Sequence, residues 1–295
     1  FRRCKMESSN ENGPTREMIR TACEENDLKT LQQYVSEGVS VNSRVYSKVD
    51  YVPLLLCALF HNATDVATYL LAHPEIDIYR CLRAAVEHGT TEHVKFLVEH
   101  GADVNAKELD DNPLLSVPVT VDMAKYLISI GFDAKKASLG SQTSLETIKV
   151  LVDAGADTNA PDSLNYTPLM WYFDNDEWDL DIVDFFASRA TNLNNGGNFS
   201  RSTLDKALSR AEDVSNGVEA VKILLKYGAR PLFQEIVNVG EKPVLFRTLL
   251  EGKADPNMKF TFPDGPTVTL MKALTGPNVD PEALEILKEF GATEQ

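Results

Sequence analysis

The sequence predicts an all-α solenoid of about nine helix-turn-helix repeats, several of them with short or missing β-hairpins. The first supporting observation is that "EHVKFLVEHGADVNA" at 92–106 returns as "ETIKVLVDAGADTNA" at 146–160 and, shortened, as "EAVKILLKYGAR" at 219–230. The second is that apolar residues precede the glycine of each phrase at identical offsets. The third is that positions in this register recur about every 32 residues, a period typical of helical repeats.

The residues before each reference glycine are expected to form an amphipathic helix. Val94, Leu97 and Val98 precede Gly101 at the i, i+3, i+4 spacing that places three apolar side chains on one helix face. A glycine after the last turn lets the chain adopt the left-handed conformation that satisfies the final carbonyl groups. The nine reference positions in this register are Gly38, Pro74, Gly101, Gly131, Gly155, Ala190, Gly228, Lys253 and Gly291.

Three intervals and two reference residues depart from this pattern. The intervals that end at positions 101, 155 and 253 have only 27, 24 and 25 residues, so we expect them to lack most of a β-hairpin. Ala190 and Lys253 carry a Cβ, which strains a left-handed turn. These two turns are therefore expected to have a different geometry.

The recurring segments resemble ankyrin repeats. "RCLRAAVEHGTTEHVKFLVEHGADVNA" at 80–106 and "NYTPLM" at 165–170 show the opening, the helices, the glycine turn and the hairpin exit that this family shares. The resemblance covers residues 15–295 and implies a single ankyrin-repeat solenoid, with a disordered tail at 1–14. The histidine of the family's TPLH opening is absent, which predicts weaker polar ties between neighbouring repeats.

The composition disfavours several classes of function. The net charge of −15 repels nucleic-acid phosphates and anionic lipid surfaces, so we expect no nucleic acid and no membrane among the partners. No apolar run is long enough to span a bilayer and no secretory signal is visible, which predicts a cytoplasmic or nuclear protein. The four cysteines are single, so free thiols are expected.

The five histidines all lie within residues 61–100, but the predicted register directs them differently. His73 and His100 fall at exposed ends of helices, His93 on a packing shoulder and His88 at a turn. A metal site needs three or four convergent ligands, so we expect no metal and no cofactor. A metalloenzyme in this segment is the alternative, which zinc-binding calorimetry would test.

No pattern of an enzyme is present. The acidic run "FDNDEWDLDIVDF" at 173–185 lacks the spacing of a calcium loop, and its carboxylates suit a solvated helix N-terminus. No phosphate-binding loop, dinucleotide fingerprint or nucleophile elbow occurs. We therefore expect no catalytic residues.

Two asparagines are candidates for modification. The contexts of Asn105 in "GADVNA" and Asn159 in "GADTNA" resemble the hairpin asparagines that an asparaginyl hydroxylase modifies in some ankyrin proteins. The structural alternative is that each side chain hydrogen-bonds its own turn.

Partner contacts are expected on hairpin tips and on the exposed side of the first helix of each repeat. Aromatic side chains there suit binding anchors, and acidic neighbours favour a basic, partly extended partner segment. For Trp171, Tyr172 and Phe173, the alternative is that they fill space beside the irregular segment 174–180. The candidate partner-binding residues are Lys48, Tyr51, Glu108, Leu109, Asp111, Ser163, Leu164, Tyr166, Trp171, Asp174, Phe260 and Phe262.

These features favour a monomeric, non-catalytic protein-interaction module or adaptor. The alternative is a pathogen-delivered or host-directed inhibitor that blocks an enzyme or a signalling protein. The two differ in whether the partner comes from the protein's own proteome or from a foreign one.

Overall fold

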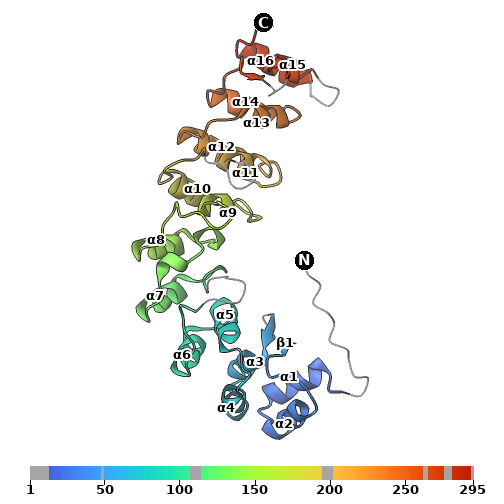
Figure 1. Ribbon diagram of the computed structural model, residues 1–295, viewed down its shortest axis with the longest axis vertical. Coiled ribbons are helices and arrows are strands. Elements are labelled where there is room, and N and C mark those ends of the chain that lie inside the picture. Colours follow the sequence, from blue (N-terminus) through green and yellow to red (C-terminus); the bar gives the residue numbers. More distant parts are fainter. Residues whose placement is uncertain are drawn as a thin grey trace. The chain divides into compact units, whose positions relative to one another are not determined.

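A computed structural model describes residues 13–47, 50–106, 114–194, 202–261, 265–275 and 281–293 (Figure 1). Within these ranges the chain is mostly helical, with two short antiparallel hairpins. Its contacts divide it into two compact units, Phe1–Ala137 and Ser138–Gln295, and each is described by itself. The continuation of one solenoid from the first unit into the second stays a prediction.

Unit 1 (Phe1–Ala137) contains four repeats. Each repeat ends in a helix of nine residues, called here the second helix. The second helices are α2 (Leu28–Ser36), α4 (Thr64–Ala72), α6 (Thr91–Glu99) and α7 (Val121–Ser129). The first helices are α1 (Arg16–Glu24), α3 (Leu54–Phe60) and α5 (Ile78–His88), and strand β1 (Arg44–Tyr46) pairs with β2 (Tyr51–Pro53) ahead of α3.

Unit 2 (Ser138–Gln295) contains five repeats. Its second helices are α8 (Leu145–Asp153), α10 (Leu180–Ala187), α12 (Gly217–Lys226), α14 (Pro243–Glu251) and α16 (Pro281–Glu289). Its first helices are α9 (Pro168–Tyr172), α11 (Thr203–Leu208), α13 (Phe233–Asn238) and α15 (Leu270–Ala273), and the hairpin of β3 (Lys259–Thr261) with β4 (Thr267–Thr269) precedes α15. All nine predicted second helices are therefore confirmed.

The predicted apolar faces hold the second helices against one another. Val94 and Leu97 in α6, like Ile148 and Leu151 in α8, are fully buried, whereas the third position, as at Val98, is half-buried. In unit 2, α10 packs on α12, α12 on α14, and α14 on α16. Full burial of a large aliphatic side chain contributes roughly 1.5–3 kcal/mol. Stacking of neighbouring repeats thus supplies the core.

Repeats four and five differ from the predicted helix-turn-helix unit, because neither has an α-helical first helix in the described ranges. In repeat four, residues 114–120 form turns and extended chain, and Pro118 disfavours helical geometry at the residue before it. In repeat five, single-turn 3₁₀ helices take its place: η1 (Ala134–Lys136), among the last residues of unit 1, and η2 (Leu139–Ser141), among the first residues of unit 2. The interval of 24 residues leaves too little chain for a full first helix.

The three short intervals lack β-hairpins, as predicted. The loop before α9 also has no strands, although a hairpin is predicted there. In this loop the N–H of Asp162 donates to the carbonyl of Tyr166 at 3.0 Å, and Asn165 adopts a left-handed φ of 59°. A tight turn therefore replaces strand pairing.

The turns that end at the six reference glycines have the predicted left-handed geometry. Ala190 has no positive φ, so its different turn is confirmed. The same prediction is wrong for Lys253, whose φ is 70°. The N–H of Ala254 still donates to the carbonyl of Leu249 at 3.1 Å, so the usual turn is kept despite the Cβ. The left-handed glycines, with φ between 87° and 106°, are Gly38, Gly101, Gly131, Gly155, Gly228 and Gly291.

A polar contact, called here an asparagine clamp, links five pairs of neighbouring repeats. An asparagine at the exit of one repeat donates from Nδ2 to a backbone carbonyl at the exit of the next, and its Oδ1 accepts the N–H two residues further on. Asn105 thus binds the carbonyl of Gly131 and the N–H of Asp133, both at 2.8 Å. The five asparagines are Asn42, Asn105, Asn159, Asn194 and Asn257.

The clamps correct one expectation. Asn105 and Asn159 reach the next repeat, while Asp103 and Asp157 close the turns by accepting the asparagine N–H at 2.8 Å. The weaker polar ties expected from the missing histidine stay a prediction. All five clamps lie in long intervals, and the described residues of the three short intervals form none.

One buried carboxylate links two first helices of unit 2. Glu235 in α13 is 4% exposed, and it accepts hydrogen bonds from Ser202 Oγ at 2.5 Å and from the N–H of Leu232 at 2.7 Å. Ser202 also caps α11 by accepting the N–H of Asp205 at 3.0 Å. Burial raises the pKa of Glu235 above its ordinary value, because the charged form loses its hydration.

Replacing Lys253 with glycine should stabilise the protein. Glycine adopts a φ near 70° without the Cβ strain that costs roughly 1–2 kcal/mol in other residues. We expect a gain of about 1 kcal/mol in the free energy of unfolding, measured by urea denaturation. Lys253→Ala keeps the Cβ and is the matched control, so an equal gain from both variants would contradict this explanation.

Replacing Asn159 with alanine should destabilise unit 2, because the carbonyl of Arg189 and the N–H of Thr191 lose their partner. We expect a loss of about 1 kcal/mol in the free energy of unfolding, measured by urea denaturation. Asn238→Ala is the control, since the exposed Asn238 side chain contacts Gln234 in its own helix. A similar loss in both variants would argue against the clamp.

Ionisation of Glu235 should destabilise the folded protein. Its folded-state pKa lies above the ordinary value, so its contribution is fully present below the unfolded pKa and is lost as pH rises through the folded pKa. Glu235→Gln keeps partners for Ser202 and Leu232 but does not titrate. Relative to wild type, this variant should gain stability in urea titrations as pH rises above the ordinary carboxyl pKa and Glu235 of the wild type ionises. A pH-independent difference would refute the assignment.

Candidate protein-interaction surface

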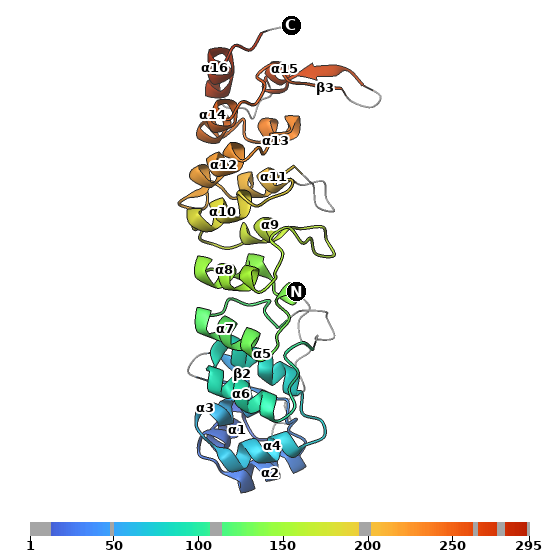
Figure 2. The ribbon, with the colours of Figure 1, turned by 90° about the vertical axis from the view of Figure 1, so that its left-hand side faces the viewer.

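Large exposed apolar side chains gather on one side of the repeats. We call this side the finger face: the first helices together with the loops and hairpins that precede them. In unit 2, Figure 2 shows the first helices with their loops on one side and the second helices on the other. Among the described residues, six of the seven strongly exposed large apolar side chains lie on the finger face, and the seventh, Val244, lies in α14. The six are Met18, Tyr46, Leu164, Trp171, Leu232 and Phe260.

Around Trp171, hydrogen bonds and ring packing hold part of the finger face of unit 2 in place. The indole is 38% exposed, its Nε1 donates to Asp162 Oδ2 at 2.8 Å, and it packs edge-on against Tyr166 with ring centroids 5.5 Å apart. Asp162 Oδ1 also accepts the N–H groups of Leu164 at 2.8 Å and of Tyr166 at 2.9 Å. One carboxylate therefore fixes both the loop tip and the tryptophan ring that it presents to solvent.

Gly140 allows α9 to take this position. A Cβ on Gly140 would lie 2.4 Å from the carbonyl oxygen of Pro168 and 2.6 Å from the Cβ of Trp171. Because the first of these atoms is backbone, it cannot move aside cheaply, and only glycine lets η2 pack on the first turn of α9. The repeat pattern does not single out this residue, since it lies outside the shared register.

The predicted aromatic residues divide between core and surface. Tyr172 and Phe173 are 2% and 0% exposed, so the space-filling alternative holds for them, whereas Trp171 reaches solvent. Tyr166 is only 9% exposed, so the expectation of an exposed ring is wrong there. Trp178, which the pattern does not single out, fills the core beside Phe173 with ring centroids 4.7 Å apart.

The predicted acidic residues after α9 already have partners within the chain. Asp174 binds Lys206 Nζ at 2.7 Å, and Asp176 binds Arg210 at 3.0 Å. Arg210 also donates to the backbone carbonyls of residues 173–175. Lysine and arginine thus compensate the two carboxylates, and these contacts shape the irregular segment after α9 instead of leaving a free acidic patch.

A second apolar group in unit 2 joins α13 to the C-terminal hairpin. Phe260 in β3 is 41% exposed and stacks on Phe233, with ring centroids 5.5 Å apart and 23° between the planes. Leu232, which precedes Phe233, is 53% exposed. The predicted hairpin identifies Phe260. Leu232 and Phe233 are not predicted, because they lie in the interval that ends at residue 253, where no hairpin is expected.

In unit 1, the hairpin of β1 and β2 carries the exposed aromatic ring. Tyr46 is 70% exposed and packs against Tyr51 with ring centroids 5.2 Å apart. Tyr51, the predicted contact residue, is half-buried, and the guanidinium groups of Arg16 and Arg44 each lie 5.2 Å from its ring centroid. Tyr46 therefore offers the larger free surface.

Three further predicted residues, Ser163, Asn105 and Asn159, lie in the described ranges. Ser163 is exposed at the loop tip beside Leu164. Asn105 and Asn159 are half-buried in their clamps, and their hydroxylation stays a prediction. The predicted contact residues that lie outside the described ranges, and whose roles stay predictions, are Lys48, Glu108, Leu109, Asp111 and Phe262.

The cysteine thiols in the described ranges are protonated at neutral pH. Cys23, Cys57 and Cys81 are free and buried, and burial raises the pKa of each to about 12. Their protonated form is a poor nucleophile at neutral pH.

None of the helices in the described ranges combines the length and the hydropathy that crossing a bilayer requires.

Known proteins share this repeat. A family model of three ankyrin repeats matches residues 19–108. The chain is 30% identical over 154 residues to an ankyrin repeat protein of fowlpox virus, and 25% identical over 177 residues to the palmitoyltransferase AKR1 of Lachancea kluyveri. These alignments cover 46% and 51% of this chain but only 23% and 24% of the relatives. The chain thus spans about a quarter of each.

A solved structure of an ankyrin repeat domain from Acinetobacter baumannii aligns with 80% of this chain and 98% of that domain, at 18% identity and a TM-score of 0.36. The segment matched by the family model contains the second helices, the left-handed glycine turns and the clamps that recur through the rest of the described chain. Residues 19–108 of this chain are therefore ankyrin repeats.

Proposed function

We propose that this protein is a non-catalytic interaction module that binds a partner protein across its finger face. Ankyrin repeats are generally protein–protein interaction modules, and their fold is typically non-enzymatic. The observation that supports binding by this chain is the placement of six of its seven strongly exposed large apolar side chains, among the described residues, on that face. Such side chains gain free energy when a partner covers them.

The proposed anchors in unit 2 are Trp171 with Leu164 at one position and Phe260 with Leu232 at another. Tryptophan is among the residue types that most often dominate binding energy. The hydrogen bond to Asp162 holds the Trp171 ring in place before a partner arrives, so little side-chain freedom is lost on binding. Phe260 is held similarly by its stacking on Phe233.

We assign the partner a segment that is both apolar and basic. Apolar side chains would cover the anchors, and the net charge of −15 would attract basic residues over a long range. Because Asp174 and Asp176 are already paired with Lys206 and Arg210, the charge is assigned to steering and the anchors to contact. An extended segment suits this arrangement, since the anchors belong to different repeats.

A second candidate function is inhibition of a foreign enzyme or signalling protein. The 30% identity to an ankyrin repeat protein of fowlpox virus over 154 residues is the observation that favours it. The same face would serve both functions, which differ only in where the partner comes from. Palmitoyl transfer is not carried over from the relative AKR1, because the alignment spans 24% of that protein.

Alanine substitution of the anchors should weaken partner binding. The full chain is used to capture a partner, and Kd is then measured by calorimetry for wild type, Trp171→Ala and Phe260→Ala. Each variant should bind at least about tenfold more weakly, because a buried aromatic anchor is worth roughly 2 kcal/mol. Circular dichroism checks that both variants keep their helices.

Val244→Ala is the matched control, since Val244 is 63% exposed but lies on a second helix. Its Kd should equal that of wild type. Equal weakening by all three variants, or unchanged binding by both anchor variants, would place the contact elsewhere. Capture from the protein's own proteome favours an adaptor, and capture only from a foreign one favours an inhibitor.

A further inference from the structure

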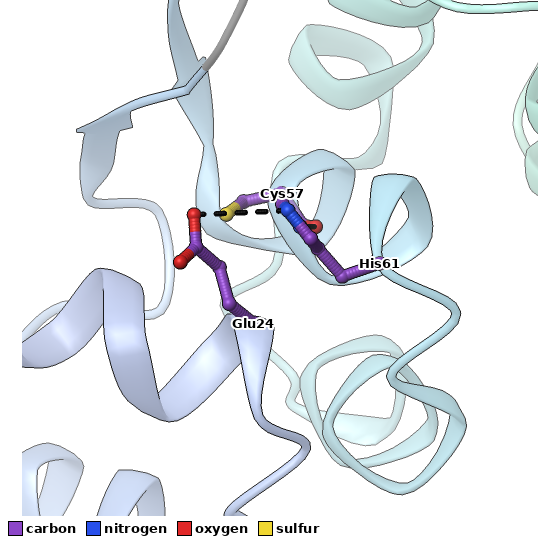
Figure 3. Close-up of side chains that lie close together, drawn as sticks. All are labelled: Glu24, Cys57 and His61. Carbon is purple, nitrogen blue, oxygen red and sulfur yellow. Dashed lines mark hydrogen bonds and ion pairs between the residues drawn. The ribbon is translucent and has the colours of Figure 1, made fainter.

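Three different metal-binding groups lie together in unit 1 (Figure 3). Glu24 is the last residue of α1, Cys57 lies within α3, and His61 follows the last turn of α3. One ligand atom from each of them lies within 4.8 Å of the other two. Glu24 Oε1 and His61 Nε2 are 3.7 Å apart.

The fold explains why these residues meet. Cys57 and His61 are four residues apart, which places both side chains on the same side of α3. Helix α1 packs directly on α3, because the first helices of the first two repeats stack. The C-terminal end of α1 thereby brings Glu24 to that side.

The histidine is oriented as metal-binding histidines usually are. Its Nδ1 lies 3.0 Å from the carbonyl oxygen of Cys57. A carbonyl only accepts, so Nδ1 carries the hydrogen and donates it, and in the neutral ring Nε2 keeps its lone pair. A hydrogen bond of this kind fixes the tautomer and the ring orientation of a ligating histidine.

The Nε2 lone pair points into a region that favours a cation. It faces Glu24 Oε1, and two acceptors at 3.7 Å repel each other unless a positive charge lies between them. The nearest described cation is Arg20, whose Nε lies 3.7 Å from the same oxygen, too far for a hydrogen bond. The carboxylate therefore has capacity for a further, closer positive partner.

We propose that Glu24, Cys57 and His61 bind a zinc ion, with water as the fourth ligand. A thiolate, an imidazole and a carboxylate are ligands that Zn²⁺ accepts in tetrahedral sites. Zinc–ligand bonds of about 2.0–2.3 Å place ligand atoms roughly 3.3–3.7 Å apart, so small side-chain rotations complete the site. On binding, the Cys57 thiol releases its proton to solvent and the sulfur forms the bond to zinc.

The surroundings suit entry of the ion. Cys57 is fully buried, whereas the side chains of Glu24 and His61 are 27% and 22% exposed. The sulfur is thus shielded from water, while the carboxylate and the imidazole remain in contact with it. Bound zinc would join α1 to α3 and stabilise the first two repeats, a role independent of partner binding on the finger face.

The histidines are predicted to point in different directions and so to form no metal site. In the structure, three of them lie at the ends of three different helices. His73 and His100 follow the last turns of α4 and α6, and His88 ends α5. The proposed site needs only one histidine. Its other two ligands are a glutamate and a cysteine, and Glu24 lies far from His61 in the sequence. The spacing of the histidines therefore does not reveal the site.

Zinc binding is tested on the full chain, prepared without a polyhistidine tag and treated with a chelator. Calorimetry should show one Zn²⁺ per chain, and added Co²⁺ should give the near-ultraviolet band of a cobalt–thiolate bond. Cys57→Ser should remove that band. His61→Gln, at a partly exposed position, should weaken Zn²⁺ binding at least about tenfold while circular dichroism stays unchanged.

Two matched controls define the site. His100→Gln removes a histidine whose Nδ1 likewise contacts the carbonyl four residues earlier, at 2.7 Å, and Cys81→Ser removes a buried free thiol outside the cluster. Both should bind Zn²⁺ as wild type does. Absence of stoichiometric binding would leave only an ion pair between Glu24 and protonated His61 and would overturn the proposal. Binding that survives both Cys57→Ser and His61→Gln would overturn it as well.

Discussion

Two short helices cannot bury an apolar face against each other and also exclude water from its far side, so each repeat depends on its neighbour. The second helices carry this dependence: in α6 and α8 the first two positions of the apolar triplet are fully buried, and the third is half-buried. Each helix is too short to be stable in water on its own. Helix length, the left-handed turn and the repeat spacing all serve this one contact between layers.

Apolar contact sets how tightly the layers pack, but it does not set their angle or offset, because it has no direction. The asparagine clamps supply direction. Each fixes a carbonyl and an N–H of the next repeat within hydrogen-bonding distance, as Asn257 does with Gly291 and Thr293. The short intervals have no hairpin and, among their described residues, no clamp. In the one that ends at residue 253, buried Glu235 instead supplies a fixed link between α11 and α13.

The features that the sequence predicts well are those decided within one repeat. Apolar periodicity and a glycine suffice to place every second helix, because both act over a few residues. The described residues of repeats four and five include no α-helical first helix, which follows from Pro118 and from a short interval. Both are visible in the sequence but act against the repeat pattern. The left-handed turn at Lys253 keeps the hydrogen bond from the N–H of Ala254 to the carbonyl of Leu249 despite the Cβ, which a rule based on residue type alone does not foresee.

The candidate sites are harder to predict, because they depend on contacts between repeats. Lys206 from the following repeat lies over the ring of Tyr166 and also compensates Asp174. Gly140 matters only because α9 lies against it. The cluster of Glu24 with Cys57 and His61 exists only after α1 and α3 have stacked. Exposure and charge at a repeat surface are thus properties of pairs of repeats.

The clamp has a consequence for how such a chain can diverge. On the receiving side it uses a backbone carbonyl and a backbone N–H, which every residue type except proline supplies. Substitutions in the receiving repeat can therefore accumulate without breaking the link, as the different residues at the receiving N–H, Asp133, Thr191 and Arg230, illustrate. Drift in side-chain identity is tolerated where the asparagine is retained, which leaves the loop tips free to adapt to new binding partners while the scaffold persists.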